Sequence, residues 1–209
     1  MRTDEQKRQA KLRTQQKKKR SKNKSKNKQT QKPVGRPAGS TNKNKAELVL
    51  NPELLRILAQ AQKLLKLISK KVNICYFVLD GHFGNRCAGC MVRQLDLHII
   101  SKMRANAALY LEPTADQKHK QPRLKYGTRL DYANLPEDRL CSCTTEDGYC
   151  TQVYQAKCLH KDFAEPLNVV IVVKTHLLSG GRGHVVLFST DLSLGADILV
   201  DYYSWFAHF

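Results

Sequence analysis

The fold-deciding stretch of this chain is Cys75-Tyr76-Phe77-Val78-Leu79-Asp80-Gly81-His82-Phe83-Gly84. Its apolar first half, rich in aromatic and aliphatic residues, predicts a buried β-strand, and two glycines mark the point where that strand ends. Asp80 is therefore expected at the carboxyl-terminal edge of a sheet, where open α/β sheets hold ligands and catalytic groups. A second interpretation stays open, in which Asp80 only caps a helix that begins near Asn85.

The segments around this strand predict an alternation of helices and strands. Asn51, Pro52 and Glu53 form a helix-start signal, and a broad apolar face follows as far as Ile68. The order helix, strand, helix, strand in the first half is consistent with a parallel α/β sheet. Residues 112–150 are polar and contain several prolines, so a long irregular insertion is expected there. The remaining predicted elements are helices over residues 85–95 and 194–203, and strands over residues 97–103, 151–158, 168–175 and 185–190.

Basic residues are concentrated at the start of the chain. The whole sequence has 36 Lys and Arg against 18 Asp and Glu, a net charge of +18. Residues 1–45 contain 17 of the basic residues and two acidic ones, which gives +15, whereas the remaining 164 residues carry only +3. Because this first segment has almost no large apolar side chains, residues 1–48 are predicted to be a disordered tail or linker. Its natural partners are polyanions, and binding should weaken steeply with salt.

Two parts of the tail are candidate DNA contacts. The densest run of cations is Lys17, Lys18, Lys19 and Arg20. Further on, Gly35, Arg36 and Pro37 resemble the core of an AT-hook, in which an arginine enters the narrow A·T minor groove. Only one copy of this motif occurs and its flanking positions differ, so a generic solvated polycation or linker is the alternative.

Several motifs in order resemble the insertion-sequence transposases that have an Asp-Asp-Glu active site. The resemblance covers about residues 72–204. It rests on the residues 80–84, Asp-Gly-His-Phe-Gly, on residues 91–93 and 98–104, and on the later segments 187–194 and 198–203. These two later segments together resemble the part of the family that leads into its final catalytic helix.

This resemblance implies a fold and a chemistry. The expected fold class is α/β: an incomplete ribonuclease-H-like mixed sheet with flanking helices over residues 49–209, preceded by the disordered basic tail. The implied reaction is in-line attack on a phosphodiester, with two Mg²⁺ or Mn²⁺ ions about 4 Å apart held by three carboxylates. Asp80 matches the family's second aspartate, so the resemblance makes it catalytic and a metal ligand.

The other two carboxylates of the family are not found in this sequence. The first aspartate belongs to an upstream strand, but only a helix and the basic tail precede Asp80. Tyr203 matches the tyrosine of the family's Tyr-Arg-Glu-Lys motif, whereas Phe206 stands at the arginine position and the glutamate would fall one position past Phe209. We therefore expect a transposase truncated at both ends, with a reading frame that slipped after Ser204. Such a chain is expected to be catalytically incomplete.

The cysteines support a rival hypothesis, a non-catalytic basic nucleic-acid-binding protein supported by zinc. Cys87 and Cys90 have the spacing of zinc ligands, and further thiols lie downstream near His160. The later spacings fit no familiar zinc ribbon, and the odd total of seven cysteines favours reduced thiols. The downstream thiols are Cys141, Cys143, Cys150 and Cys158.

Partners and location complete the expectations. DNA is the expected partner, and the intact parent is expected to form a homodimer. No apolar run is long enough to span a membrane, and no signal peptide opens the chain, so a cytoplasmic protein associated with the bacterial nucleoid is expected.

Overall fold

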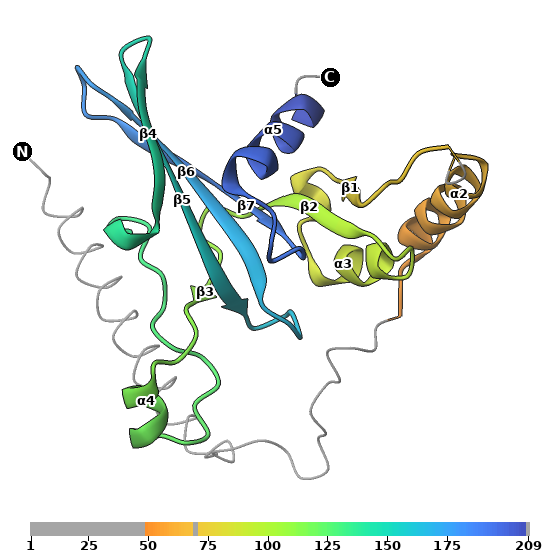
Figure 1. Ribbon diagram of the computed structural model, residues 1–209, viewed down its shortest axis with the longest axis horizontal. Coiled ribbons are helices and arrows are strands. Elements are labelled where there is room, and N and C mark those ends of the chain that lie inside the picture. The colour runs from red at the N-terminus through yellow and green to blue at the C-terminus, as the bar shows by residue number, and fades with distance from the viewer. Residues whose placement is uncertain (1–48, 69–70, 208–209) are drawn as a thin grey trace, which may run out of the picture. The chain divides into compact units, whose positions relative to one another are not determined.

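The computed structural model describes residues 49–68 and 71–207, which form a seven-stranded mixed sheet flanked by helices (Figure 1). The predicted α/β class with a mixed, ribonuclease-H-like sheet is confirmed. In chain order the elements are α2 (Pro52–Ile68), β1 (Tyr76–Val78), the 3-10 helix η1 (Gly81–Phe83), α3 (Arg86–Arg93), β2 (His98–Met103), β3 (Leu109–Tyr110), α4 (Ala115–Lys120), the 3-10 helix η2 (Glu137–Arg139), β4 (Leu140–Glu146), β5 (Tyr149–His160), β6 (Leu167–His176), β7 (Arg182–Ser189) and α5 (Ala196–Ala207).

The strand order in the sheet is β1-β2-β7-β6-β5-β3, and β4 pairs with β5 outside this path. Strands β1 and β2 are parallel, with Tyr76 opposite His98, while every other pair is antiparallel. The parallel pairing expected from the helix–strand order of the first half is therefore confirmed for β1 and β2, and the other strands pair antiparallel, which makes the sheet mixed as predicted. The physical reason is that short connections join β5, β6 and β7, and such connections produce antiparallel neighbours.

The sheet separates two apolar clusters, one on each face. Strand β6 reads as an almost continuous apolar run because it contributes to both, with Val169 facing one side and Val170 the other. Helix α3 covers the first face, where Met91 packs in the same cluster as Phe188. Helix α5 covers the opposite face through Leu199. Figure 1 shows α3 and α5 on opposite sides of β2.

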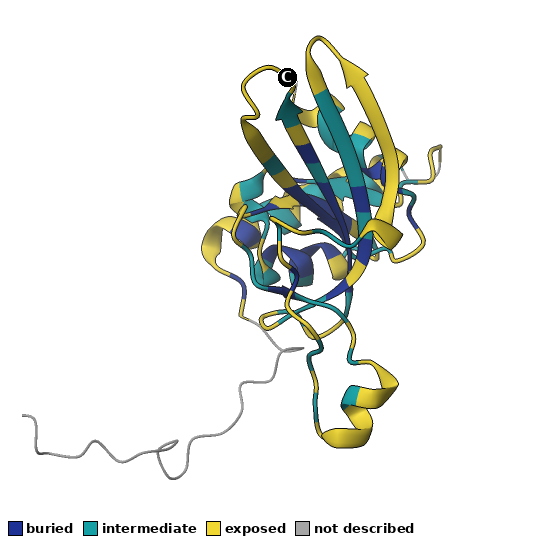
Figure 2. Cartoon of the chain, turned by 90° about the vertical axis from the view of Figure 1, so that its left-hand side faces the viewer, coloured by how far each residue is buried: buried dark blue, intermediate teal, exposed yellow. Residues whose placement is uncertain are grey.

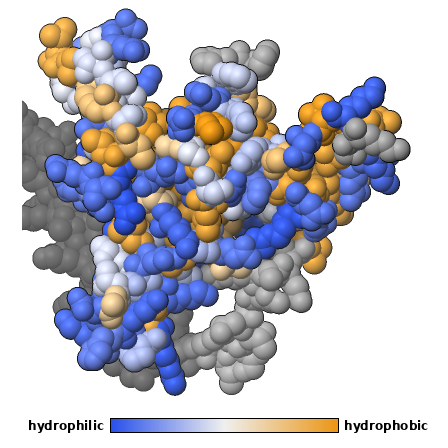
Figure 3. All heavy atoms as spheres, in the orientation of Figure 1, coloured by the Kyte–Doolittle hydropathy of each residue, from blue (hydrophilic) through white to orange (hydrophobic). Residues whose placement is uncertain are grey.

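The two helices on the first face begin as the sequence predicts. The Asn51 side chain accepts a hydrogen bond from the backbone N–H of Leu54 at 2.8 Å, so Asn51 is the N-cap of α2. Helix α3 ends at Arg93, two residues before the predicted end, and the chain then turns at Asp96, which has a left-handed φ of 56°. Much of the apolar face of α2 remains on the surface (Figure 3), where Leu64 is 56% and Leu67 75% exposed.

The irregular insertion predicted over residues 112–150 is wrong in its second half. Strand β4 and the start of β5 form a hairpin there, and α4 and η2 precede it. Every residue of β4 is exposed (Figure 2), so the strand has no alternation of apolar and polar residues to reveal it. Asp147 and Gly148 form the turn with φ values of 51° and 76°, as an Asp-Gly hairpin turn requires.

Within residues 49–68 and 71–207, no helix is both long and apolar enough to cross a membrane. The predicted tail, residues 1–48, lies outside the described residues.

Candidate functional site at the end of strand β1

Asp80 lies where the sequence places it, just past the carboxyl end of β1 (Tyr76–Val78). Two hydrogen bonds with β2 fix this position: the backbone N–H of Leu79 donates to the carbonyl of Ile100 at 2.9 Å, and the Ser101 hydroxyl donates to the carbonyl of Asp80 at 2.9 Å. Ser101 is fully buried, so the backbone at Asp80 is held by the sheet while its side chain is exposed.

Asp80 also serves as a cap, but for a different helix from the one expected. Its carboxylate accepts a hydrogen bond from the backbone N–H of Gly81 and is the N-cap of η1. Helix α3 has its own cap, because the Asn85 side chain accepts from the N–H of Ala88 at 3.1 Å. Local hydrogen bonding therefore accounts for one carboxylate oxygen of Asp80 and leaves the acid at the protein surface.

The glycines after Asp80 allow the turn to lie directly on β2. A Cβ atom on Gly84 would fall 1.9 Å from the carbonyl oxygen of Lys102, closer than any real contact. A Cβ on Gly81 would lie 3.1 Å from Cε of the same lysine. The Lys102 side chain therefore runs along the Asp80 turn, and only glycine fits at position 84.

Helix α5 brings Tyr203 to the same turn from the other side of the sheet. Burial raises the pKa of Tyr203, the negative charge of Asp80 raises it further, and a backbone hydrogen bond from Gly81 lowers it. The site thus joins three segments: the end of β1 with Asp80, the end of β2 with Lys102, and the last turns of α5 with Tyr203. Tyr203 was identified from the sequence as a motif residue, but its approach to Asp80 is a tertiary feature.

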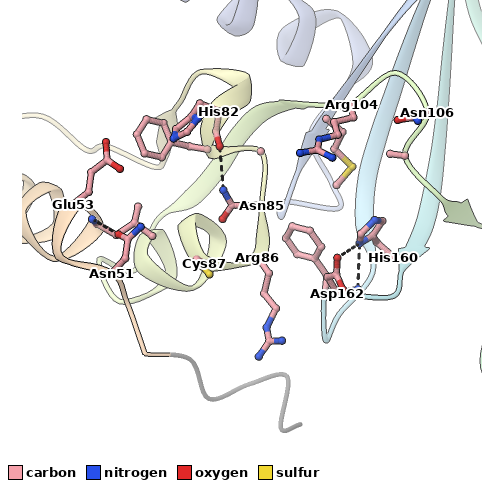
Figure 4. A pocket seen from close by; sticks show the side chains of 16 residues that line it. Asn51, Glu53, His82, Asn85, Arg86, Cys87, Arg104, Asn106, His160 and Asp162 are labelled. Carbon is pink, nitrogen blue, oxygen red and sulfur yellow. Dashed lines mark hydrogen bonds and ion pairs between the residues drawn. The ribbon is translucent and has the colours of Figure 1, made fainter. Parts of the chain in front are cut away.

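A cavity of about 710 Å³ opens beside this turn, and the sequence gives no direct signal for it. Figure 4 shows His82 and Arg104 at its upper side, with Asn51 and Glu53 of the α2 end opposite Asp162. Nδ1 of His160 lies 3.9 Å from the Asp162 carboxylate and accepts a hydrogen bond from the backbone N–H of Asp162 at 3.2 Å. Because its walls come from the ends of α2, β2 and β5 as well as η1, the cavity depends on the assembled fold.

A separate polar cluster lies at the opposite end of β1. The hydroxyl of Tyr76 donates to Asp191 at 2.6 Å, and the backbone N–H and hydroxyl of Ser193 donate to the same carboxylate at 2.9 and 2.7 Å. The hydrogen bond to Asp191 raises the pKa of Tyr76 to about 12. Burial raises the pKa of Asp191, but these hydrogen bonds outweigh burial and leave it lowered. The cluster ties β1 to the segment after β7 and is distinct from the Asp80 site.

The described residues do not fit a two-ion carboxylate site. Nowhere in residues 49–68 and 71–207 do three or more His, Cys, Asp or Glu side chains gather closely enough to hold a metal ion. Asp80 therefore belongs to no such cluster among the described residues, and one of its oxygens already accepts the Gly81 N–H.

The lack of a metal-ligand cluster among the described residues also argues against a zinc site built from the cysteines. Cys87 and Cys90 lie on α3, whereas Cys143 and Cys150 lie on the hairpin of β4 and β5. Cys158 is buried in β5, and burial raises its pKa to about 12, which disfavours the thiolate that zinc requires. In the described part of the chain, the cysteines therefore assemble no set of zinc ligands.

The candidate DNA contacts of the tail are not positioned by the structure. Lys17, Lys18, Lys19 and Arg20, and the AT-hook-like Gly35, Arg36 and Pro37, all lie outside the described residues.

Comparison with protein families identifies the class to which this fold and site belong. The family model described as "DDE superfamily endonuclease" matches residues 8–157. The chain belongs to this superfamily, and the resemblance to Asp-Asp-Glu transposases is confirmed at that level. The match includes Asp80 but ends before Tyr203, so the C-terminal motif lies beyond it. Comparisons with curated proteins and with solved structures give no match.

Proposed function

We propose that this chain is a DNA-binding member of the DDE endonuclease superfamily that descends from an insertion-sequence transposase. The family match supports DNA as the substrate or partner. The +15 charge of residues 1–45 supplies the attraction to the phosphate backbone, with Lys17–Arg20 and the segment around Arg36 as the contacts. The homodimer expected of the intact parent belongs to the same proposal, as does association with the nucleoid, which would follow from DNA binding.

We further propose that Asp80 is the family's metal-binding carboxylate and that the chain is catalytically incomplete. The observation that carries this proposal is the position of Asp80, an exposed acid at the carboxyl end of β1 that belongs to no cluster of three or more potential metal ligands among the described residues. Mg²⁺ prefers several hard oxygen ligands, and a two-ion reaction divides them between two ions. A site with so few ligands would bind such an ion weakly, and strand cleavage or transfer would require further acids from outside the described residues.

Titration with Mn²⁺ tests the role of Asp80, because this paramagnetic ion broadens the NMR signals of nearby amides. We expect selective broadening at Gly81 and His82 with a dissociation constant in the millimolar range. Asp80→Asn should abolish this broadening. The matched control Asp116→Asn, which removes an exposed acid from α4, should leave it unchanged.

Two outcomes would contradict this part of the proposal. Broadening that survives Asp80→Asn would remove Asp80 as a ligand. Micromolar binding at Asp80 would mean that further ligands assemble around it, and the chain would then not be incomplete.

A further inference from the structure

We propose that Cys143 and Cys150 form a reversible cross-strand disulfide when the chain meets a small-molecule disulfide such as glutathione disulfide. The sulfur atoms of these two cysteines lie 3.6 Å apart on the hairpin of β4 and β5. In the strand register Cys143 faces Gln152 and Thr145 faces Cys150, so the two cysteines are diagonal neighbours on one face of the hairpin. The sulfurs are in van der Waals contact, and a disulfide forms when they approach to the bond length of about 2.05 Å.

An oxidant in solution can reach this pair. All seven residues of β4 are exposed (Figure 2), and Cys150 on β5 is partly exposed. The neighbouring Cys141 is also exposed, but its sulfur lies 3.7 Å from the carbonyl oxygen of Arg139 and 4.0 Å from the side-chain oxygen of Gln155. Cys158, further along β5, is buried. Cys143 and Cys150 are thus close to each other and accessible to solvent.

The reaction is a thiol–disulfide exchange in two steps. The thiolate of one of the two cysteines attacks one sulfur of glutathione disulfide, the sulfur–sulfur bond of that molecule breaks, and one glutathione leaves as a thiolate. The thiolate of the other cysteine then attacks the protein sulfur of the mixed disulfide and expels the second glutathione. Two protein thiols lose two protons and two electrons in total, and glutathione disulfide is reduced to two glutathione molecules.

The disulfide would restrain strand β4, which has few contacts with the rest of the sheet. Strand β4 pairs with β5 alone, its register is interrupted between Leu140 and Ser142, and none of its side chains is buried. Segments of this kind open locally at low cost in free energy. A disulfide close to the turn at Asp147 and Gly148 would limit that opening, and we expect amide exchange over residues 140–150 to slow by about tenfold or more.

The test treats the full chain with excess glutathione disulfide and maps the product by mass spectrometry. Cleavage at the bond between Glu146 and Asp147 separates Cys143 from Cys150, so a disulfide leaves the two fragments joined. We expect a chain lighter by two hydrogen atoms, joined fragments, and full reversal by excess reduced glutathione. Cys141→Ser is the matched control and should oxidise in the same way. Cys143→Ser should give only glutathione adducts and no joined fragments.

Three results would overturn the proposal. The first is a wild-type chain that carries only glutathione adducts after long incubation. The second is a Cys143→Ser variant whose fragments are still joined, which would assign the bond to Cys141. The third is joined wild-type fragments without slower amide exchange in β4, which would show that the bond does not restrain the hairpin.

Discussion

Replacing Gly84 with alanine is expected to destabilise the folded domain by about 3 kcal/mol, at the upper end of the usual cost of overpacking. The new Cβ would lie 1.9 Å from the carbonyl oxygen of Lys102 and 3.1 Å from that of Gly81. Both obstacles are backbone atoms, so a side-chain rotation cannot relieve the clash. The turn after Asp80 must move away from β2, and the 2.9 Å hydrogen bond from Ser101 to the Asp80 carbonyl would be disturbed. Chemical denaturation measures the change in free energy of unfolding.

Alanine substitutions at two other glycines are expected to destabilise the domain less than Gly84→Ala does. Gly183→Ala on β7 places its Cβ in open space, so its free energy of unfolding should change by less than about 1 kcal/mol. Gly81→Ala meets the flexible end of the Lys102 side chain at 3.1 Å and should fall between the two. Equal effects of Gly84→Ala and Gly183→Ala would show that the turn does not lie against β2 as described.

Replacing Lys17, Lys18, Lys19 and Arg20 together with glutamine is expected to weaken DNA binding by about tenfold to a hundredfold at moderate salt. Each lost phosphate contact removes a released counterion. The slope of log affinity against log salt concentration should therefore become shallower by up to about 3 to 4. Fluorescence anisotropy with a labelled duplex, repeated over a range of salt concentrations, measures both quantities.

The matched control removes the same charge from the folded domain. Lys118, Lys120, Arg123 and Lys125 are exposed, and their replacement by glutamine also lowers the net charge by four. Because charges away from the contact are screened within about 10 Å, this control should alter the affinity by no more than about threefold. Equal losses in the two variants would mean that overall charge, and not the tail, governs binding.

The sequence was a good guide where a signal is local. The apolar run before Asp80 predicted β1, and Asn51 and Pro52 predicted the start of α2. Gly81 and Gly84 correctly marked the end of the strand. Their packing against Lys102 could not be read from the sequence, because it depends on how β2 pairs with β1. Tyr203 was recognised as part of a motif, but its approach to Asp80 depends on how α5 crosses the sheet.

The hairpin of β4 and β5 is the part of the fold that the sequence analysis missed. A strand with no buried side chain has no apolar periodicity, so residues 140–146 looked irregular. The Asp147-Gly148 turn was the signal that could have found the hairpin. With that turn in place, Cys143 and Cys150 fall on one face as diagonal neighbours. The cysteines were instead considered as zinc ligands, an arrangement that requires Cys87 and Cys90 from a different part of the fold.

The most direct test of the account is nicking of supercoiled plasmid DNA in Mg²⁺ or Mn²⁺, comparing the wild-type chain with Asp80→Asn. Both proteins are used at a concentration where anisotropy shows that each has bound the DNA. The account predicts DNA binding by both and no metal-dependent nicking by the wild-type chain above the level of Asp80→Asn, because the described residues contain no cluster of three or more potential metal ligands. Nicking by the wild-type chain that is lost in Asp80→Asn would contradict it.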